Sequence, residues 1–204
     1  MRLLAIDCAS PACSVALFDD GALIDFRHEE LGRGHAERLV PMIAELPGRG
    51  RADRIAVARG PGSFTGVRIG IAAARALALA WGADLAGYPS LALIAAQALE
   101  GEARAVSVAM AGGHGEIFVQ NFGADGLPQT QLASLAPDSA ADALSHPLVA
   151  GSKAAELAEL RGSGTALPIL PDARAVPLLP AALIGPDVSP LYGRGPDARL
   201  PGQK

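Results

Sequence analysis

The residues most suggestive of chemistry lie in one glycine-rich segment, GPGSFTG at residues 60–66. It follows a short apolar strand and opens onto a helix, an arrangement whose backbone N–H groups often hold phosphates. A P-loop also needs a lysine directly after its second glycine, but Val67 and Arg68 follow here. The dinucleotide pattern G-x-G-x-x-G fails as well, because its third glycine comes one residue late. The segment therefore predicts a strand–turn–helix junction, with Ser63 or Thr65 as the helix cap, and only a weak nucleotide site.

Other catalytic and metal-binding patterns find no match in the chain. The four histidines are scattered, and the two cysteines, Cys8 and Cys13, have neither zinc-site spacing nor an identifiable histidine partner. No Gly-x-Ser-x-Gly elbow of a serine hydrolase occurs. We therefore assign no catalytic residue and no metal ligand. The cysteines flank a four-residue turn, so a disulfide is geometrically conceivable, but reduced thiols are expected in a cytoplasmic chain.

The composition is neither strongly basic nor typical of a membrane protein. The 204 residues, half of them hydrophobic, suffice for one large or two small domains. The formal charge of -4 argues against a free-standing nucleic-acid binder. The segment from Arg27 to Arg75 nevertheless holds nine arginines and five acids, which indicates either a solvated basic face or a surface for a polyanion or an acidic partner. No uncharged apolar run reaches about 18 residues, and the N-terminus reads as a strand, so we expect a cytoplasmic protein without a membrane anchor.

Hydrophobic periodicity predicts an α/β fold that divides near residue 102. Three strands joined by tight turns occupy residues 3–30, and a helix interrupted by Pro41 follows them. A strand, the glycine-rich turn, a long apolar helix, a fifth strand and a helix capped by Ser90 complete the first half. The second half opens with a hairpin, and its dense prolines after residue 162 should thin out regular structure. The apolar stripe of the first helix consists of Leu39, Met42, Ile43 and Leu46.

The long helix carries a face without side chains. Gly66, Gly70 and Ala74 recur every four residues and form a continuous groove. A glycine inside a helix costs about 0.5–1 kcal/mol relative to alanine, so two of them on one face suggest the close approach of another element. That element is either the protein's own sheet or a partner protein, and the spacing alone does not decide between them.

Four segments of the sequence resemble the bacterial TsaB (YeaZ) family, within the glycoprotease-like superfamily. They are LLAIDCASPACSVAL, GHAERLVPMI, GPGSFTGVRIG and the tail SPLYGRGPDA. The resemblance implies the two-lobed fold of actin, Hsp70 and sugar kinases, with a βββαβαβα layout in each lobe and a shortened second lobe. We therefore expect an N-terminal lobe at residues 1–102 and a smaller C-terminal lobe at residues 103–204.

The resemblance also implies a function. TsaB proteins are non-catalytic subunits that bind the TsaD-type transferase, which makes N6-threonylcarbamoyladenosine beside the anticodon of tRNA. A TsaE-type ATPase joins them, and tRNA is bound only through the complex. The isolated chain is expected to form a homodimer. First-lobe helices are implied as the partner interface. We expect that interface to consist of Leu39, Met42, Ile43, Leu46, Gly66, Gly70, Ala73, Ala74 and Leu77.

Two departures bear on chemistry, the first from the catalytic relatives and the second from the family's own usual pattern. Those relatives carry an H-x-x-x-H metal pair where this chain has Ser90 and Ile94, and isoleucine cannot bind a metal. The first hairpin keeps Asp7, but Cys8 and Ala9 replace a Thr-Ser pair, which leaves Asp7 and Ser10 as weak candidates for nucleotide contact. We expect no cofactor in the isolated chain, and ATP or ADP only at an interface of the complex. The alternative is a glycoprotease-like hydrolase or a small-molecule kinase of the same fold.

Overall fold

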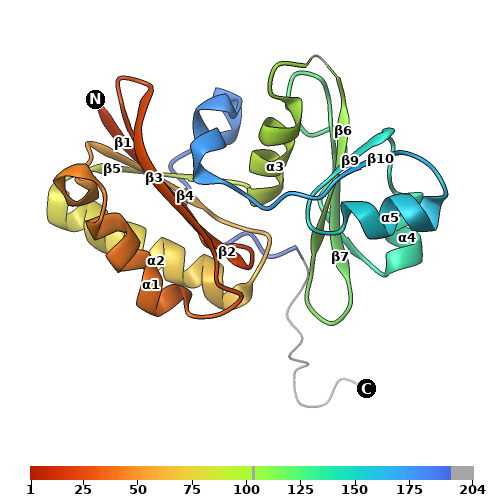
Figure 1. The fold of residues 1–204 in the computed structure, drawn as a ribbon, viewed down its shortest axis with the longest axis horizontal. Helices are drawn as coiled ribbons and strands as arrows, with labels where there is room; N and C mark the ends of the chain where they lie inside the picture. Colours follow the sequence, from red (N-terminus) through yellow and green to blue (C-terminus); the bar gives the residue numbers. More distant parts are fainter. Residues whose placement is uncertain (103, 194–204) are drawn as a thin grey trace.

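The computed structural model describes residues 1–102 and 104–193 and contains two five-stranded sheets that stand beside each other (Figure 1). The first sheet has the strand order β3-β2-β1-β4-β5. Strands β1, β4 and β5 run parallel, and β2 and β3 are added antiparallel as a meander. Its strands are β1 (Arg2–Asp7), β2 (Ala12–Asp19), β3 (Ala22–Glu30), β4 (Arg54–Ala58) and β5 (Asp84–Tyr88).

Three helices complete the first half in the order βββαβαβα. They are α1 (His35–Ala44), α2 (Phe64–Trp81) and α3 (Ser90–Leu99), with a short 3-10 turn η1 (Pro47–Gly50) after α1. Helices α1 and α2 cover one face of the first sheet, while α3 lies on the other face, between the two sheets (Figure 1). Nearly every side chain of α3 is buried, as a helix that is apolar on all sides requires.

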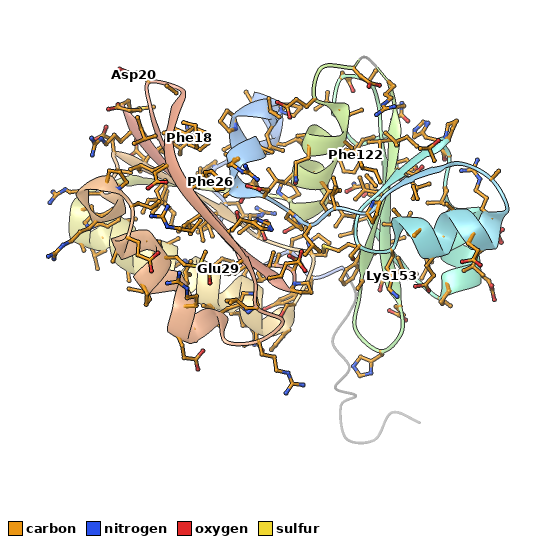
Figure 2. The ribbon with its side chains drawn as sticks, viewed as in Figure 1. Phe18, Asp20, Phe26, Glu29, Phe122 and Lys153 are labelled. Atoms are coloured by element: carbon orange, nitrogen blue, oxygen red, sulfur yellow. The ribbon has the colours of Figure 1, made fainter. Side chains whose placement is uncertain are left out.

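The second sheet repeats the layout in shortened form, with the strand order β10-β9-β6-β7-β8. Helices α4 and α5 cover its outer face (Figure 1), and Phe122 is buried on the side that faces α3 (Figure 2). Its elements are β6 (Val106–Ala111), β7 (Ile117–Phe122), β8 (Ala133–Leu135), α4 (Pro137–Asp142), β9 (Leu148–Ala150), α5 (Ala154–Arg161) and β10 (Thr165–Leu167). The two-lobe α/β layout expected from the sequence is confirmed. The lobe boundary near residue 102 stays a prediction, because buried side chains of both sheets form one continuous cluster.

The chain returns to the first lobe after β10. Two 3-10 turns, η2 (Ala173–Leu178) and η3 (Ala181–Leu183), lead into a strap that we define as residues 184–193. Gly185 pairs with Gly87 at the edge of β5, and the Leu191 N–H donates to the Arg59 carbonyl at 2.7 Å. The thinning of regular structure among the prolines is therefore confirmed, and yet the strap is held by specific contacts. The tail from residue 194 lies outside the described residues.

The helix caps expected from the sequence are only partly correct. Ser63 caps α2, since its hydroxyl oxygen accepts from the Gly66 N–H at 3.1 Å. Ser90 does not cap α3: the cap position belongs to Pro89, and Ser90 is the first helical residue. Its buried hydroxyl has no hydrogen-bond partner within the described part of the chain. A serine directly before an apolar helical run, such as Ser90 before Leu91, therefore marks the start of a helix without fixing its cap.

Candidate functional site

A cavity of about 1,020 Å³ lies between the two lobes. Most of its lining comes from four segments: the first hairpin turn at residues 9–11, the glycine-rich loop and start of α2 at residues 62–68, the β6–β7 hairpin with residues 110–114, and the end of the strap at residues 191–193. Gly32 and Ser152 also line it. The fold therefore brings the glycine-rich segment to the wall of a cleft of ligand size.

The glycines of this segment are required by packing against the first hairpin. A Cβ atom on Gly62 would lie 2.0 Å from the Ala9 carbonyl oxygen, and one on Gly66 would lie 2.0 Å from the Cys8 carbonyl oxygen. The Ser63 N–H also donates to the Ala9 carbonyl at 2.7 Å. The loop is thus a close junction between its own strand, helix and hairpin, as the sequence predicts.

The first hairpin turn is poorly equipped to hold phosphates. The Ala9 N–H donates to Oδ1 of Asp7 at 2.8 Å, the Ala12 N–H donates to the Ser10 hydroxyl at 3.1 Å, and Pro11 has no N–H. Most donors that could cradle a phosphate are therefore used inside the turn. Ser10 lines the cavity, whereas Asp7 is fully buried behind it.

Burial also changes the charge of Asp7. Loss of solvent raises the pKa of this carboxyl from its ordinary value of 3.8 to about 7, against the lowering effect of the Ala9 hydrogen bond. Its Oδ2 atom has no hydrogen-bond partner in the described residues. A carboxyl that is buried and half protonated near neutral pH is a poor ligand for a magnesium–nucleotide complex. A nucleotide role for Asp7 and Ser10 stays a prediction.

An aromatic and cationic contact between α2 and the strap forms part of the cavity lining. Nη2 of Arg68 donates to the Tyr192 hydroxyl at 2.8 Å, and its guanidinium lies 3.5 Å from the ring centroid of Phe64. The rings of Phe64 and Tyr192 stack with centroids 5.8 Å apart. Among the described residues that line the cavity, none is an aspartate or a glutamate. The described lining therefore offers no carboxylate of the kind that phosphoryl transfer and hydrolysis generally use.

The position of the catalytic relatives' metal pair is part of the core here. Ser90 and Ile94 are fully buried on α3. Within residues 1–102 and 104–193, no group of three or more His, Cys, Asp or Glu side chains is placed to hold a metal ion. The absence of a metal in the isolated chain stays a prediction.

The predicted interface stripe faces inward, which corrects its assignment to a partner surface. Its four members, Leu39, Met42, Ile43 and Leu46, are all at most 3% exposed. They pack against the first sheet, because α1 must cover β2. These side chains stabilise the chain itself and are not available to a partner.

The glycine groove of α2 also faces the chain's own sheet. A Cβ atom on Gly70 would lie 3.6 Å from both Cys8 Cβ and Val57 Cγ2, and Ala74 is fully buried. Of the two alternatives that spacing left open, packing on the protein's own sheet is therefore the correct one for Gly66, Gly70 and Ala74. Ala73 and Leu77 are half-buried at the edge of the same helix.

The opposite side of the two helices forms an exposed apolar surface, which we call the outer helical face. Its largest side chains are Val40, which is 53% exposed, and Leu79, which is 86% exposed. The other members of the face are alanines of α1 and α2. Arg68 and Arg75 also lie exposed on α2. By length and composition α2 would also suffice to cross a membrane, but a third of it is buried in the protein. The face consists of Ala36, Val40, Ala44, Ala72, Ala76, Leu79 and Ala80.

The prediction from the sequence missed this face because, on α1, it assigned the row of larger apolar side chains to the partner interface. On α1, however, Ala36, Val40 and Ala44 also recur every four residues, as an exposed row beside the buried stripe. An apolar row that continues past the buried stripe is a signal of a second contact, outside the chain's own core.

An acidic and basic network holds α1 to the edge strand β3. Nε of Arg38 donates to Glu29 at 2.8 Å, and a second guanidinium nitrogen of Arg38 donates to Glu45 at 2.6 Å (Figure 2 labels Glu29). The Arg38 hydrogen bonds lower the pKa of Glu29 and of Glu45. Arginines of the basic segment are thus partly paired within the protein, which supports the interpretation of a solvated face for this part.

Comparison with known proteins places these observations in a family. Residues 28–187 match the family model described as TsaD, tRNA N6-adenosine threonylcarbamoyltransferase. The tRNA threonylcarbamoyladenosine biosynthesis protein TsaB of Escherichia coli K12 is 49% identical over 90 residues, which cover 42% of this chain and 38% of that protein. The matched part thus spans less than half of this curated relative.

Two further relatives match over nearly their full length. An uncharacterised protein of Mycobacterium tuberculosis H37Rv is 34% identical over 209 residues, covering 97% of this chain and 93% of that protein. The structure of YeaZ from Pseudomonas aeruginosa superposes with a TM-score of 0.77 and 27% identity, covering 94% of this chain and 99% of that chain. The expected two-lobed fold is therefore confirmed by sequence and by structure.

Proposed function

The chain belongs to the TsaB/YeaZ family, within the proteins matched by the TsaD family model, and we propose that it is a non-catalytic subunit. It binds and organises a TsaD-type transferase that makes N6-threonylcarbamoyladenosine at the tRNA adenosine next to the anticodon. The observation that carries this proposal is the outer helical face, an exposed apolar surface on the first lobe.

The cavity argues for a binding role and against chemistry in this chain. Its lining has no carboxylate in the described residues. In the hairpin turn, the Ala9 and Ala12 N–H groups already donate to Asp7 and Ser10. A small-molecule kinase needs donors for its phosphates, and a glycoprotease-like hydrolase needs an activated nucleophile or a metal. Among the described residues, the cavity lining does not show the set of groups that either alternative function needs.

The outer helical face supports a protein partner. Large exposed apolar patches on folded proteins usually mark sites of interaction. The small alanines around Val40 and Leu79 permit close approach of two further helices, which would form a four-helix contact. A homologous catalytic subunit with the same fold presents an equivalent helix pair. In its absence, a second copy of this chain covers the face as a homodimer.

The remaining components, a TsaE-type ATPase, nucleotide and tRNA, bind to the complex of this chain with the TsaD-type subunit. A TsaE-type ATPase joins the pair, ATP or ADP binds at an interface of the complex, and tRNA is bound by the complex as a whole. The net charge of -4 supports the indirect role in tRNA binding. The site of action is the cytoplasm, where tRNA is modified.

Reconstitution tests the proposed function. A TsaD-type subunit, a TsaE-type ATPase, unmodified tRNA, ATP and threonylcarbamoyl-adenylate are incubated with and without this chain, and modified adenosine is quantified by mass spectrometry. We expect modification to depend on the chain, and no modification by the chain alone. Unchanged modification in its absence, or modification by this chain without the TsaD-type subunit, would overturn the proposal.

A further inference from the structure

The two cysteines face each other across the first hairpin. The register that pairs Asp7 with Ser14 places Cys8, just after β1, directly opposite Cys13 in β2. Their Sγ atoms are 3.7 Å apart, and no disulfide joins them. Opposite residues of an antiparallel pair have Cα atoms about 4.5–5.5 Å apart, which is within the range that a disulfide bridges.

The pair is buried beneath the turn that lines the inter-lobe cavity. Cys8 is 1% exposed and Cys13 is fully buried. The turn between them, residues 9–11, forms part of the wall of that cavity, although neither cysteine lines it. Helix α2 packs over Cys8, since a Cβ atom on Gly70 would lie 3.8 Å from its Sγ. Burial of both thiols therefore favours a small oxidant such as hydrogen peroxide over a bulky disulfide reagent.

We propose that Cys8 and Cys13 are a redox-active dithiol, which a small peroxide converts reversibly into an intrachain disulfide. The Cys13 thiolate attacks one peroxide oxygen, the O–O bond breaks, and the leaving oxygen takes up protons and departs as water. The Cys8 thiol then attacks the sulfur of the resulting Cys13 sulfenic acid. The S–S bond forms as the S–O bond breaks, and the leaving oxygen takes the Cys8 proton and departs as a second water. One peroxide is reduced and two thiols are oxidised.

The order of attack follows from the contact between the thiols. The contact with Cys8 lowers the pKa of Cys13, whereas the same contact and burial raise the pKa of Cys8. Burial, Asp7 and Glu29 oppose the lowering at Cys13, and Arg38 on α1 adds to it. Cys13 is thus the first nucleophile, because the thiolate is the reactive form.

The disulfide would tie together the two ends of the turn that lines the cavity. That turn also holds the glycine-rich loop through the Ser63 N–H to the Ala9 carbonyl. Closing a six-residue loop restricts the unfolded chain, so we expect oxidation to raise the melting temperature by roughly 5 °C. The effect should be fully reversed by a dithiol reductant.

The test counts thiols in the folded protein after treatment with hydrogen peroxide. The chain holds two cysteines, so any intrachain disulfide is the one between Cys8 and Cys13. After oxidation, the protein is denatured, alkylated and weighed by mass spectrometry. We expect the wild-type chain to lose both alkylation sites together with two hydrogens, to remain monomeric on a non-reducing gel, and to regain both sites with dithiothreitol.

Two single variants control the assignment. In Cys8→Ser, peroxide should stop at a sulfenic acid on Cys13, which dimedone traps when the protein is unfolded in its presence. In Cys13→Ser, the remaining Cys8 thiol should react far more slowly. Neither variant should show the rise in melting temperature. Two alkylatable thiols retained in the folded wild-type chain after peroxide treatment would overturn the proposal. Oxidation that yields only sulfinic acid or intermolecular dimers would overturn it equally.

Discussion

Asp7 offers a quantitative test of the physical description of the first hairpin. The proposed change is Asp7→Asn, which keeps an oxygen to accept the Ala9 N–H and removes the charge. In the folded chain the carboxyl is fully buried, and its pKa is raised to about 7. In the unfolded chain it returns to its ordinary value of 3.8. The wild-type protein must therefore take up a proton on Asp7 to fold, at any pH between these values.

The sign and size of the effect follow from linkage. Between pH 3.8 and pH 7 the native state binds more protons than the unfolded state, so the free energy of unfolding falls as the pH rises. A shift of about 3 pKa units corresponds to an upper limit of about 4 kcal/mol. Asp7→Asn removes this dependence. The buried amide has an unmet donor that costs about 1–3 kcal/mol, so the variant should be less stable than wild type at pH 4 and more stable at pH 8.

Urea unfolding of both proteins between pH 4 and pH 8 measures this difference. Asp138→Asn, on the exposed side of α4, is the matched control for the loss of one carboxylate. We expect the stability of Asp7→Asn relative to wild type to rise across this range, while that of the control stays nearly constant. A flat difference for Asp7→Asn would refute the reasoning, because it would mean that Asp7 is ionised or solvated in the folded chain.

Three further predictions concern packing, metal and tRNA. Gly66→Ala should destabilise the protein by about 1–3 kcal/mol in urea unfolding, because its Cβ atom would lie 2.0 Å from the Cys8 carbonyl oxygen, whereas Gly113→Ala, with nothing within 4 Å, should be neutral. The purified chain should contain no stoichiometric zinc or iron in elemental analysis, and metal that survives dialysis would contradict the replacement of the metal pair by Ser90 and Ile94. Isolated chain should bind tRNA only weakly in filter binding, and submicromolar affinity with a steep salt dependence would count against the indirect role.

The fold of the first lobe was within reach of sequence reasoning because its signals are local. Alternating and helical periods, tight turns and the Ser63 cap each depend on a few neighbouring residues. The same locality explains the second lobe, whose strands repeat the layout in shorter form. The resemblance to a known family supplied the arrangement of the lobes, which periodicity alone does not determine.

The candidate site was predictable only in part, because burial depends on what covers a surface. Helix α2 is apolar on two sides, and spacing does not tell which side meets the sheet. Residues such as Gly70 proved internal, while Leu79 proved exposed. The strap contacts, such as Arg59 with the Asp187 carbonyl oxygen and Arg68 with Tyr192, join positions more than 120 residues apart and leave no periodic trace.

The most direct test of the central claim measures binding of a TsaD-type subunit by isothermal titration calorimetry. Leu79→Asp, on the outer helical face, is compared with wild type and with Leu160→Asp, an exposed helical leucine of α5 in the second lobe. Burial of a leucine contributes about 2 kcal/mol, so Leu79→Asp should weaken binding at least roughly 30-fold with an unchanged melting temperature. Leu160→Asp should bind as wild type does. Wild-type affinity of a folded Leu79→Asp variant would contradict the account.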